Sequence, residues 1–116
     1  PVLGCRVLVL GLTFKENCPD LRNTKVVDLV DALQGYSVEV AVYDPWINIS
    51  EAEHEYGLKC LTEAPTGGGY AAIVLAVGHR QFIEMGEAGI KALAQEGAVI
   101  YDVKGILPLG AADGRL

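Results

Sequence analysis

Three segments of the chain are apolar at nearly every position, and this pattern predicts buried strands. They cover residues 5–12, 71–77 and 98–103. Continuous apolar runs of this length are typical of parallel strands whose sheet is covered on both faces. A fourth segment, 37–43, alternates valines with polar or small residues, which predicts a strand at a more exposed flank. A weak additional strand is expected over residues 58–61.

Amphipathic segments fill the gaps between these strands. A helix is predicted over residues 26–33 because its apolar side chains recur at helical spacing. Asn23 or Thr24 is the expected N-cap of this helix, and Gly35 the expected C-terminal stop. A second, short helix is predicted over residues 50–56.

The third helical segment, residues 80–95, contains Gly86 and Gly89, so we expect one bent helix or two short ones. Strands and helices therefore alternate along the chain. This alternation predicts right-handed crossovers and a doubly wound α/β fold, with a mostly parallel, Rossmann-like sheet and helices on both faces. The sequence contains no internal repeat or linker, so residues 1–116 are expected to form a single domain.

Composition and charge exclude several classes of function. The 116 residues are 51% hydrophobic and 21% charged, which supplies one core and is too apolar for a disordered chain. Nine Lys and Arg face fifteen Asp and Glu, so the formal net charge is −6. This acidic balance disfavours nucleic acid and anionic membrane surfaces as partners. No apolar run approaches the roughly 20 residues that span a bilayer, and no secretory signal is present, so we expect a cytoplasmic protein.

Ligands of open α/β sheets bind outside the carboxyl ends of the strands, so the loops that follow the strands are the candidate sites. The loop over residues 13–23 is long for a βα connection. The loop contains the charged residues Lys15, Glu16, Asp20 and Arg22, and Lys25 lies two residues beyond it. A net positive cluster just before a helix N-terminus favours a phosphate or carboxylate site. The alternative is a surface loop held by ion pairs, Asp20–Arg22 or Glu16–Lys25.

Lys104 follows the last predicted strand, at the same edge of the sheet as Lys15. Two lysines that reach from two strand ends into one crevice would suit a diphosphate or a sugar carboxylate. The alternative for Lys104 is a solvated side chain paired with Asp102.

Other polar residues at this edge are expected to be structural. Asp44 stands where Rossmann-like folds bind ribose, but the G-x-G-x-x-G and Walker A motifs are absent, which favours a simple turn at Asp44. We expect His79 to be a hydrogen-bonded residue at a strand end rather than a base. Cys18 is expected to be inert, and three cysteines without C-x-x-C spacing predict neither a disulfide framework nor a metal site.

Four motifs carry a resemblance to a known family. They are GLTFKENCPDLRNTKV at 11–26, VYDPW at 42–46, AVGH at 76–79 and YDVKG at 101–105. In this order they resemble the C-terminal domain of the UDP-glucose/GDP-mannose dehydrogenase family, over nearly the whole chain. The variant ENCPDxRNTK resembles the branch that acts on UDP-N-acetylhexosamines.

The resemblance implies a larger enzyme. Family members have an N-terminal NAD-binding Rossmann domain, a central helical region that forms the homodimer, and a C-terminal Rossmann-like domain that binds the nucleotide of the UDP-sugar. They oxidise the sugar C6 alcohol to a carboxylate in two hydride transfers to NAD, through a thiohemiacetal on a cysteine.

The resemblance also implies roles for individual residues. Phe14 and Lys15 would lie at the UDP-sugar, and Arg22 matches an arginine that reaches toward the NAD side of the cleft. Lys104 stands where many members carry a substrate-contacting arginine, whose bidentate fork a lysine lacks. The nucleophilic cysteine of the family lies in a Gly-Gly-x-Cys segment that is absent here and that Cys18 does not match. We therefore expect no catalytic residue in this chain and no activity of the isolated domain.

The expected function is UDP-sugar binding within an NAD-dependent UDP-N-acetylglucosamine or UDP-N-acetylgalactosamine 6-dehydrogenase of surface polysaccharide biosynthesis. The chain starts at Pro1 rather than Met, so we expect a fragment of a longer enzyme whose partners are the UDP-sugar and the remaining domains. The alternative is a free-standing Rossmann-like nucleotide-binding or regulatory module without catalysis.

Overall fold

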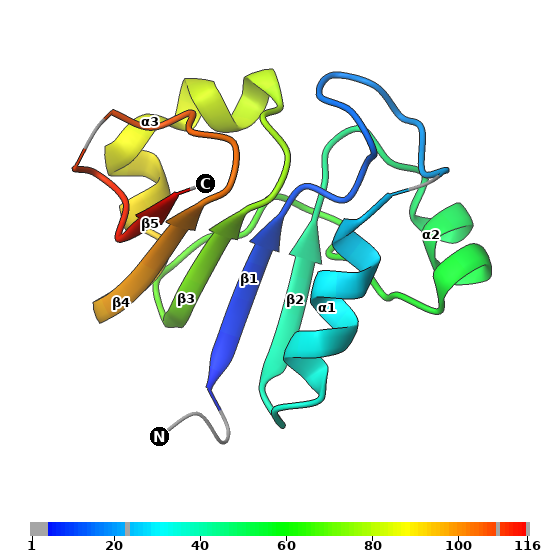
Figure 1. The fold of residues 1–116 in the computed structure, drawn as a ribbon, viewed down its shortest axis with the longest axis horizontal. Helices are drawn as coiled ribbons and strands as arrows, with labels where there is room; N and C mark the ends of the chain where they lie inside the picture. The colour runs from blue at the N-terminus through cyan, green and yellow to red at the C-terminus, as the bar shows by residue number, and fades with distance from the viewer. Residues whose placement is uncertain (1–4, 23, 109, 116) are drawn as a thin grey trace.

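Five parallel strands form one sheet in the order β2-β1-β3-β4-β5 (Figure 1). The computed structural model describes residues 5–22, 24–108 and 110–115. The strands are β1 (Arg6–Leu10), β2 (Glu39–Tyr43), β3 (Tyr70–Leu75), β4 (Ala94–Asp102) and β5 (Gly114–Arg115). The strand order reverses at β1, because β2 lies on one side of it and β3 on the other. This confirms the predicted doubly wound, parallel sheet.

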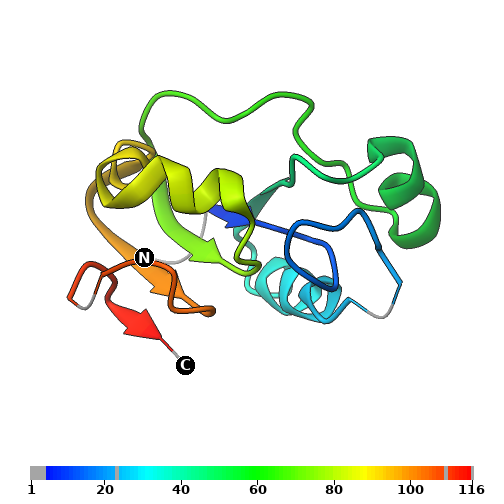
Figure 2. The same ribbon diagram turned by 90° about the horizontal axis from the view of Figure 1, so that it is seen from above.

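Within the described residues, three helices connect the strands: α1 (Val26–Gln34), α2 (Ile49–Tyr56) and α3 (Arg80–Lys91). Seen from above, α1 and α3 lie on opposite faces of the sheet, and α2 lies beyond its β2 edge (Figure 2). No helix in the described part of the chain has the length and apolar character needed to cross a bilayer.

The continuous apolar runs arise because each face of the sheet packs against its own core. In β1, Leu8 and Leu10 point into the cluster beneath α3, and Val9 points into the cluster beneath α1. All three side chains are completely buried. Two-sided burial therefore produces the run that identified this strand from sequence.

The ends of the helices differ in detail from the prediction. The N-cap residue of α1 is Lys25 rather than the expected Thr24. Thr24 lies one residue earlier, where its hydroxyl accepts the Val26 N–H at 3.1 Å and donates to the Leu12 carbonyl at 2.6 Å. The other expected cap, Asn23, lies outside the described residues. Gly86 (φ +66°) has a non-helical conformation inside α3, which confirms the expected interruption of this helical segment.

Two strand predictions need correction. Residues 58–61 do not form a strand; the Leu61 N–H makes one bond to the Val42 carbonyl at 2.8 Å, beside β2. The two residues of β5 were not predicted, because a pair of residues carries no hydrophobic period.

The face of the sheet that carries α1 is only partly covered. Ile100 of β4 points into the core beneath α3, so its neighbours Val99 and Tyr101 point to the opposite face. Val99 is 51% exposed and Tyr101 38% exposed. The described residues thus leave an apolar strip of β4 open on the α1 side.

Candidate functional site

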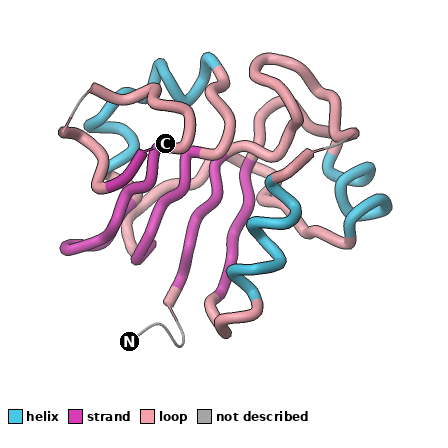
Figure 3. The backbone as a smooth tube through the Cα atoms, viewed as in Figure 1, coloured by secondary structure: helices cyan, strands magenta, loops and turns pink. Residues whose placement is uncertain are grey.

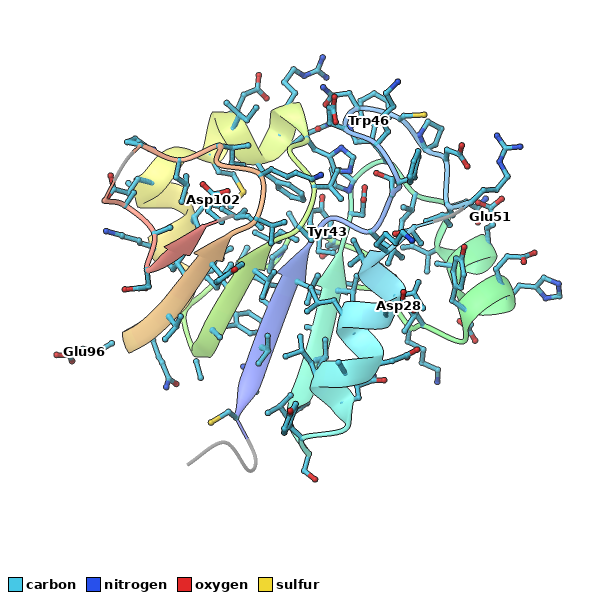
Figure 4. The ribbon with its side chains drawn as sticks, viewed as in Figure 1. Asp28, Tyr43, Trp46, Glu51, Glu96 and Asp102 are labelled. Carbon is cyan, nitrogen blue, oxygen red and sulfur yellow. The ribbon has the colours of Figure 1, made fainter. Side chains whose placement is uncertain are left out.

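The candidate site lies at the carboxyl edge of the sheet, where the loops that follow β1, β2, β3 and β4 gather (Figure 3). Trp46, in the loop after β2, and Asp102, the last residue of β4, both lie at this edge in Figure 4. The polar groups here fall into two sets: a buried network that holds the loops, and exposed side chains around a hollow.

Asp44, directly after β2, is the centre of the buried network. It is 4% exposed. Its Oδ2 accepts the backbone N–H of Leu12 at 2.7 Å and of Thr13 at 3.1 Å, and contacts Nε2 of His79 at 2.8 Å. Its Oδ1 accepts the N–H of Trp46 at 2.8 Å. Asp44 therefore starts the turn, as predicted, and also holds the loop after β1.

The hydrogen bonds determine the form of His79, which is completely buried. Its Nδ1 lies 2.9 Å from the backbone nitrogen of Asn17. Because that N–H can only donate, Nδ1 must be an unprotonated acceptor, and the ring hydrogen lies on Nε2, which faces Asp44. His79 is thus a neutral, hydrogen-bonded residue at a strand end, which confirms the expectation from sequence.

The pKa of Asp44 reflects the same contacts. Burial raises the pKa of this carboxyl, but the hydrogen bonds from His79 and from the N–H groups of Leu12 and Trp46 more than offset burial. The pKa of Asp44 therefore lies below its ordinary value. The arrangement is an ionised carboxylate beside a neutral imidazole.

A hollow of about 320 Å³ opens where the strand order reverses, between the ends of β1 and β3. Phe14 lines it from the loop after β1, Lys25 from the start of α1, Val77 from the end of β3, and Lys104 from the loop after β4. Phe14 is 54% exposed. Among the described residues, no ion pair engages Lys25 or Lys104. The hollow thus combines an apolar wall with two available cations.

Two features fix the shape of this hollow. Gly11 (φ +104°) has a conformation that favours glycine, and a Cβ at this position would meet the Cβ of Val77 at 2.6 Å. On the other side, the buried Asp102 carboxylate accepts the N–H groups of Ile106 at 3.1 Å and Leu107 at 2.8 Å. These bonds fix the loop that carries Lys104.

Lys15 is exposed and follows Phe14, but it is not among the described residues that line the hollow. Its backbone carbonyl accepts the Thr13 hydroxyl at 2.9 Å. The structure therefore brings Phe14 and Lys104 together, while the convergence of Lys15 on the same ligand stays a prediction.

Arg22 lies at a different hollow, next to Glu51 and Glu55 of α2. Its side chain is 87% exposed and forms a two-point contact with Asp20, Nε–Oδ1 3.0 Å and Nη2–Oδ2 3.2 Å. These hydrogen bonds lower the pKa of Asp20 and raise that of Arg22. Of the two ion pairs proposed as an alternative, Asp20–Arg22 forms.

Sequence reasoning gave no individual role to Lys25 and did not consider Asn17. Lys25 precedes the first residue of α1 and borders the hollow, so its position next to a helix start was the available signal. Asn17 has a left-handed backbone (φ +55°), and its Oδ1 accepts the N–H of Arg80 at 2.7 Å. Asn tolerates this conformation, but nothing local in the sequence indicates its distant partner.

Comparison with known proteins identifies the class. Residues 8–108 match the model of the UDP-glucose/GDP-mannose dehydrogenase family, UDP binding domain. The chain belongs to this family, as the sequence motifs predicted.

The chain is similar to two UDP-N-acetyl-D-glucosamine 6-dehydrogenases. The enzyme from Pseudomonas aeruginosa is 50% identical over 97% of this chain and 26% of its own length. The enzyme from Salmonella typhi is 45% identical over 99% of this chain and 27% of its own length. The chain thus spans about a quarter of the length of these relatives.

The structure of a UDP-D-ManNAc dehydrogenase from Pyrococcus horikoshii shares the fold. Its TM-score is 0.71, with 24% sequence identity, over 97% of this chain and 25% of that one.

Proposed function

We propose that residues 1–116 are the UDP-sugar-binding domain of an NAD-dependent 6-dehydrogenase that oxidises UDP-N-acetylglucosamine or UDP-N-acetylgalactosamine. The observation that carries the proposal is the hollow at the strand reversal, lined by Lys25 and Lys104, in a chain of the UDP-binding family. The names of the two similar enzymes favour the N-acetylglucosamine substrate. Surface polysaccharide synthesis and a homodimeric, cytoplasmic enzyme belong to the same proposal.

In this proposal, the hollow orients the nucleotide sugar for chemistry that occurs elsewhere in the enzyme. Lys25, Lys104 and the N-terminus of α1 neutralise the diphosphate, and Phe14 offers an apolar face to a ring of the ligand. Lys15 extends from the rim toward the sugar. The domain contributes to the rate by positioning the ligand rather than by bond making.

The loop after β1 does not fit NAD in the manner of a dinucleotide-binding turn. In that turn, backbone N–H groups point at a pyrophosphate. Here the N–H groups of Leu12 and Thr13 donate to the carboxylate of Asp44, an anion that the chain itself supplies. We therefore assign NAD binding to another domain. Arg22 would approach the cofactor only at the boundary between the two domains. To do so, its side chain would leave Asp20 or contact Asp20 and the cofactor together.

The open apolar strip of β4, Val99 and Tyr101, fits contact with other parts of a longer polypeptide. The second candidate function, a free-standing nucleotide-binding module, is supported by the fully formed hollow within this chain. The two candidates differ in the length of the gene product: about 120 residues would favour the module, and about 400 the dehydrogenase.

The binding site is tested by calorimetric titration of the full polypeptide with UDP, UMP and uridine. Because hydrogen bonds between charged groups contribute about 1.5–3 kcal/mol, Lys104→Ala should weaken UDP binding about tenfold to hundredfold and uridine binding much less. Lys59→Ala is the matched control, because Lys59 is exposed and does not line the hollow. Equal UDP affinity of the two variants would remove Lys104 from the site.

A further inference from the structure

Hydrogen bonds of His79 and Asn17 connect three distant segments beneath the exposed loop. His79 contacts Asp44 through Nε2 at 2.8 Å and Asn17 through Nδ1 at 2.9 Å. The side chain of Asn17 then returns to the next residue, accepting the N–H of Arg80 at 2.7 Å. These hydrogen bonds therefore join the end of β2, the loop after β1 and the start of α3.

The loop after β1, which these hydrogen bonds hold, carries the ligand-facing residues of the proposed site. Phe14 and Lys15 lie between two held points, Thr13 and Asn17. Thr13 is bound by Asp44 through its N–H, and its hydroxyl binds the Lys15 carbonyl. The backbone of this segment is thus fixed from inside, while the side chains of Phe14 and Lys15 remain exposed.

We propose that His79 is a positioning residue for ligand binding. With its hydrogen on Nε2, which faces Asp44, His79 offers Nδ1 as the acceptor of the Asn17 N–H and thereby sets the backbone that presents Phe14 and Lys15. This inference rests on the proposed function, since it concerns how the same site is held. His79 acts through Asn17 and Thr13, because its completely buried ring cannot touch a ligand.

The residues around the imidazole of His79 favour a single orientation of this side chain. The ring centroid of Phe82 lies 5.5 Å from that of His79, and the Trp46 centroid lies 6.3 Å away. Thr13 Oγ1 lies 3.1 Å from Nε2, on the same side as Asp44. Aromatic rings beside the imidazole and hydrogen-bond partners on both nitrogens restrict its rotation, so loss of the bond to the Asn17 N–H has a local effect on the loop.

Two substitutions test the hydrogen bonds of the two ring nitrogens of His79 separately. In His79→Asn, the short amide places an acceptor near the position of Nδ1 and keeps the Asn17 bond. In His79→Gln, the longer amide places a donor near Nε2 and keeps the Asp44 contact, but leaves the Asn17 N–H without its acceptor. The first variant is therefore the conservative replacement for positioning.

The experiment measures UDP affinity of both variants in the full polypeptide, together with hydrogen exchange of the peptide that contains Asn17. We expect His79→Asn to remain within about threefold of wild-type affinity and His79→Gln to lose about tenfold, the lower range for loss of a residue that orients a binding group. Exchange near Asn17 should stay slow in His79→Asn and become fast in His79→Gln. The inference is overturned if His79→Gln binds UDP like wild type, or if His79→Asn binds no tighter than His79→Gln.

The wild-type protein gives a test that needs no variant. In protein labelled with ¹⁵N-histidine, long-range ¹H–¹⁵N spectra should show His79 protonated at Nε2 alone. Protonation at Nδ1 would overturn the inference even if both variants failed to fold. Failure of the proposed function has a different signature, because wild-type protein would then not bind UDP at all.

Discussion

The inner and outer sides of the loop between β1 and α1 use polar residues for opposite purposes. On the inner side, Thr13, Asp44 and His79 are buried, and each polar group has a partner. On the outer side, Phe14 and Lys15 are exposed, and no ion pair among the described residues engages Lys15. A polar residue at a strand end is thus available to a ligand only if the fold has not already used it in a hydrogen bond.

The loop after β4 repeats this division. Asp102, the last residue of β4, is buried and holds the backbone of Ile106 and Leu107, whereas Lys104 in the loop is exposed at the hollow. Substitutions on the inner side should therefore change stability first, and substitutions on the outer side should change binding alone.

The largest effect is expected from Asp44→Ala. This change leaves His79 and the N–H groups of Leu12 and Thr13 without their acceptor. Because each buried unsatisfied donor costs about 1–3 kcal/mol, the free energy of unfolding should fall by about 3–5 kcal/mol. Urea denaturation measures the loss. Asp31→Ala, an exposed position of α1, should stay within about 0.5 kcal/mol of wild type. A loss of similar size in both variants would contradict the division between the two sides.

Gly11→Ala should have the next largest effect, about 1–3 kcal/mol, because the new methyl group collides with Val77 and the backbone conformation favours glycine. Gly57→Ala is the matched control: Gly57 also has a positive φ (+68°), but a Cβ added there would meet nothing within 4 Å. The difference in unfolding temperature between the two variants measures the effect of the close contact between residue 11 and Val77. If both variants unfold at the same temperature, the contact with Val77 does not constrain the site.

The stability contributed by Asp44 should decrease as the pH falls, because its carboxyl group has a lowered pKa in the folded protein. Its pKa in the folded protein lies below the ordinary 3.8, so the ionised carboxylate stabilises the fold above that pH. This contribution is lost as the pH falls from 3.8 through the folded pKa. The difference in unfolding free energy between wild type and Asp44→Asn should be full at neutral pH and shrink in this acidic range. A difference that does not change with pH would contradict the assignment.

The smallest effect is expected from Arg22→Ala. Its contact with Asp20 is solvent-exposed, and such ion pairs contribute little to stability. We expect an unchanged unfolding temperature and unchanged affinity for UDP alone. Weaker UDP binding in this variant would place Arg22 at the nucleotide rather than on the cofactor side.

The fold was predictable because the sheet is covered on both faces over β1, which makes Leu8, Val9 and Leu10 equally apolar. β5 was not predictable, because two residues have no period. For the site, the motifs indicated Phe14 and Lys104, and the strand order brings them to one hollow.

The inner side of the site could not be predicted in the same way. Asp44 and His79 were each correctly interpreted as structural, but nothing in their separation of 35 residues indicates that they pair. Asn17 and Arg80, 63 residues apart, meet only because the loop after β1 folds over the start of α3. Such contacts depend on loop geometry, which hydrophobic periodicity does not encode.

In the proposed site, the exposed cations of the hollow bind the diphosphate while the buried network holds the loops. A crystal structure of the full polypeptide with UDP tests it most directly. We predict phosphate oxygens within about 4 Å of the Nζ atoms of Lys104 and Lys25, a distance typical of an ion pair, with the Asp44–His79 contact unchanged. UDP bound away from this hollow, or in direct contact with Asp44, would contradict the account.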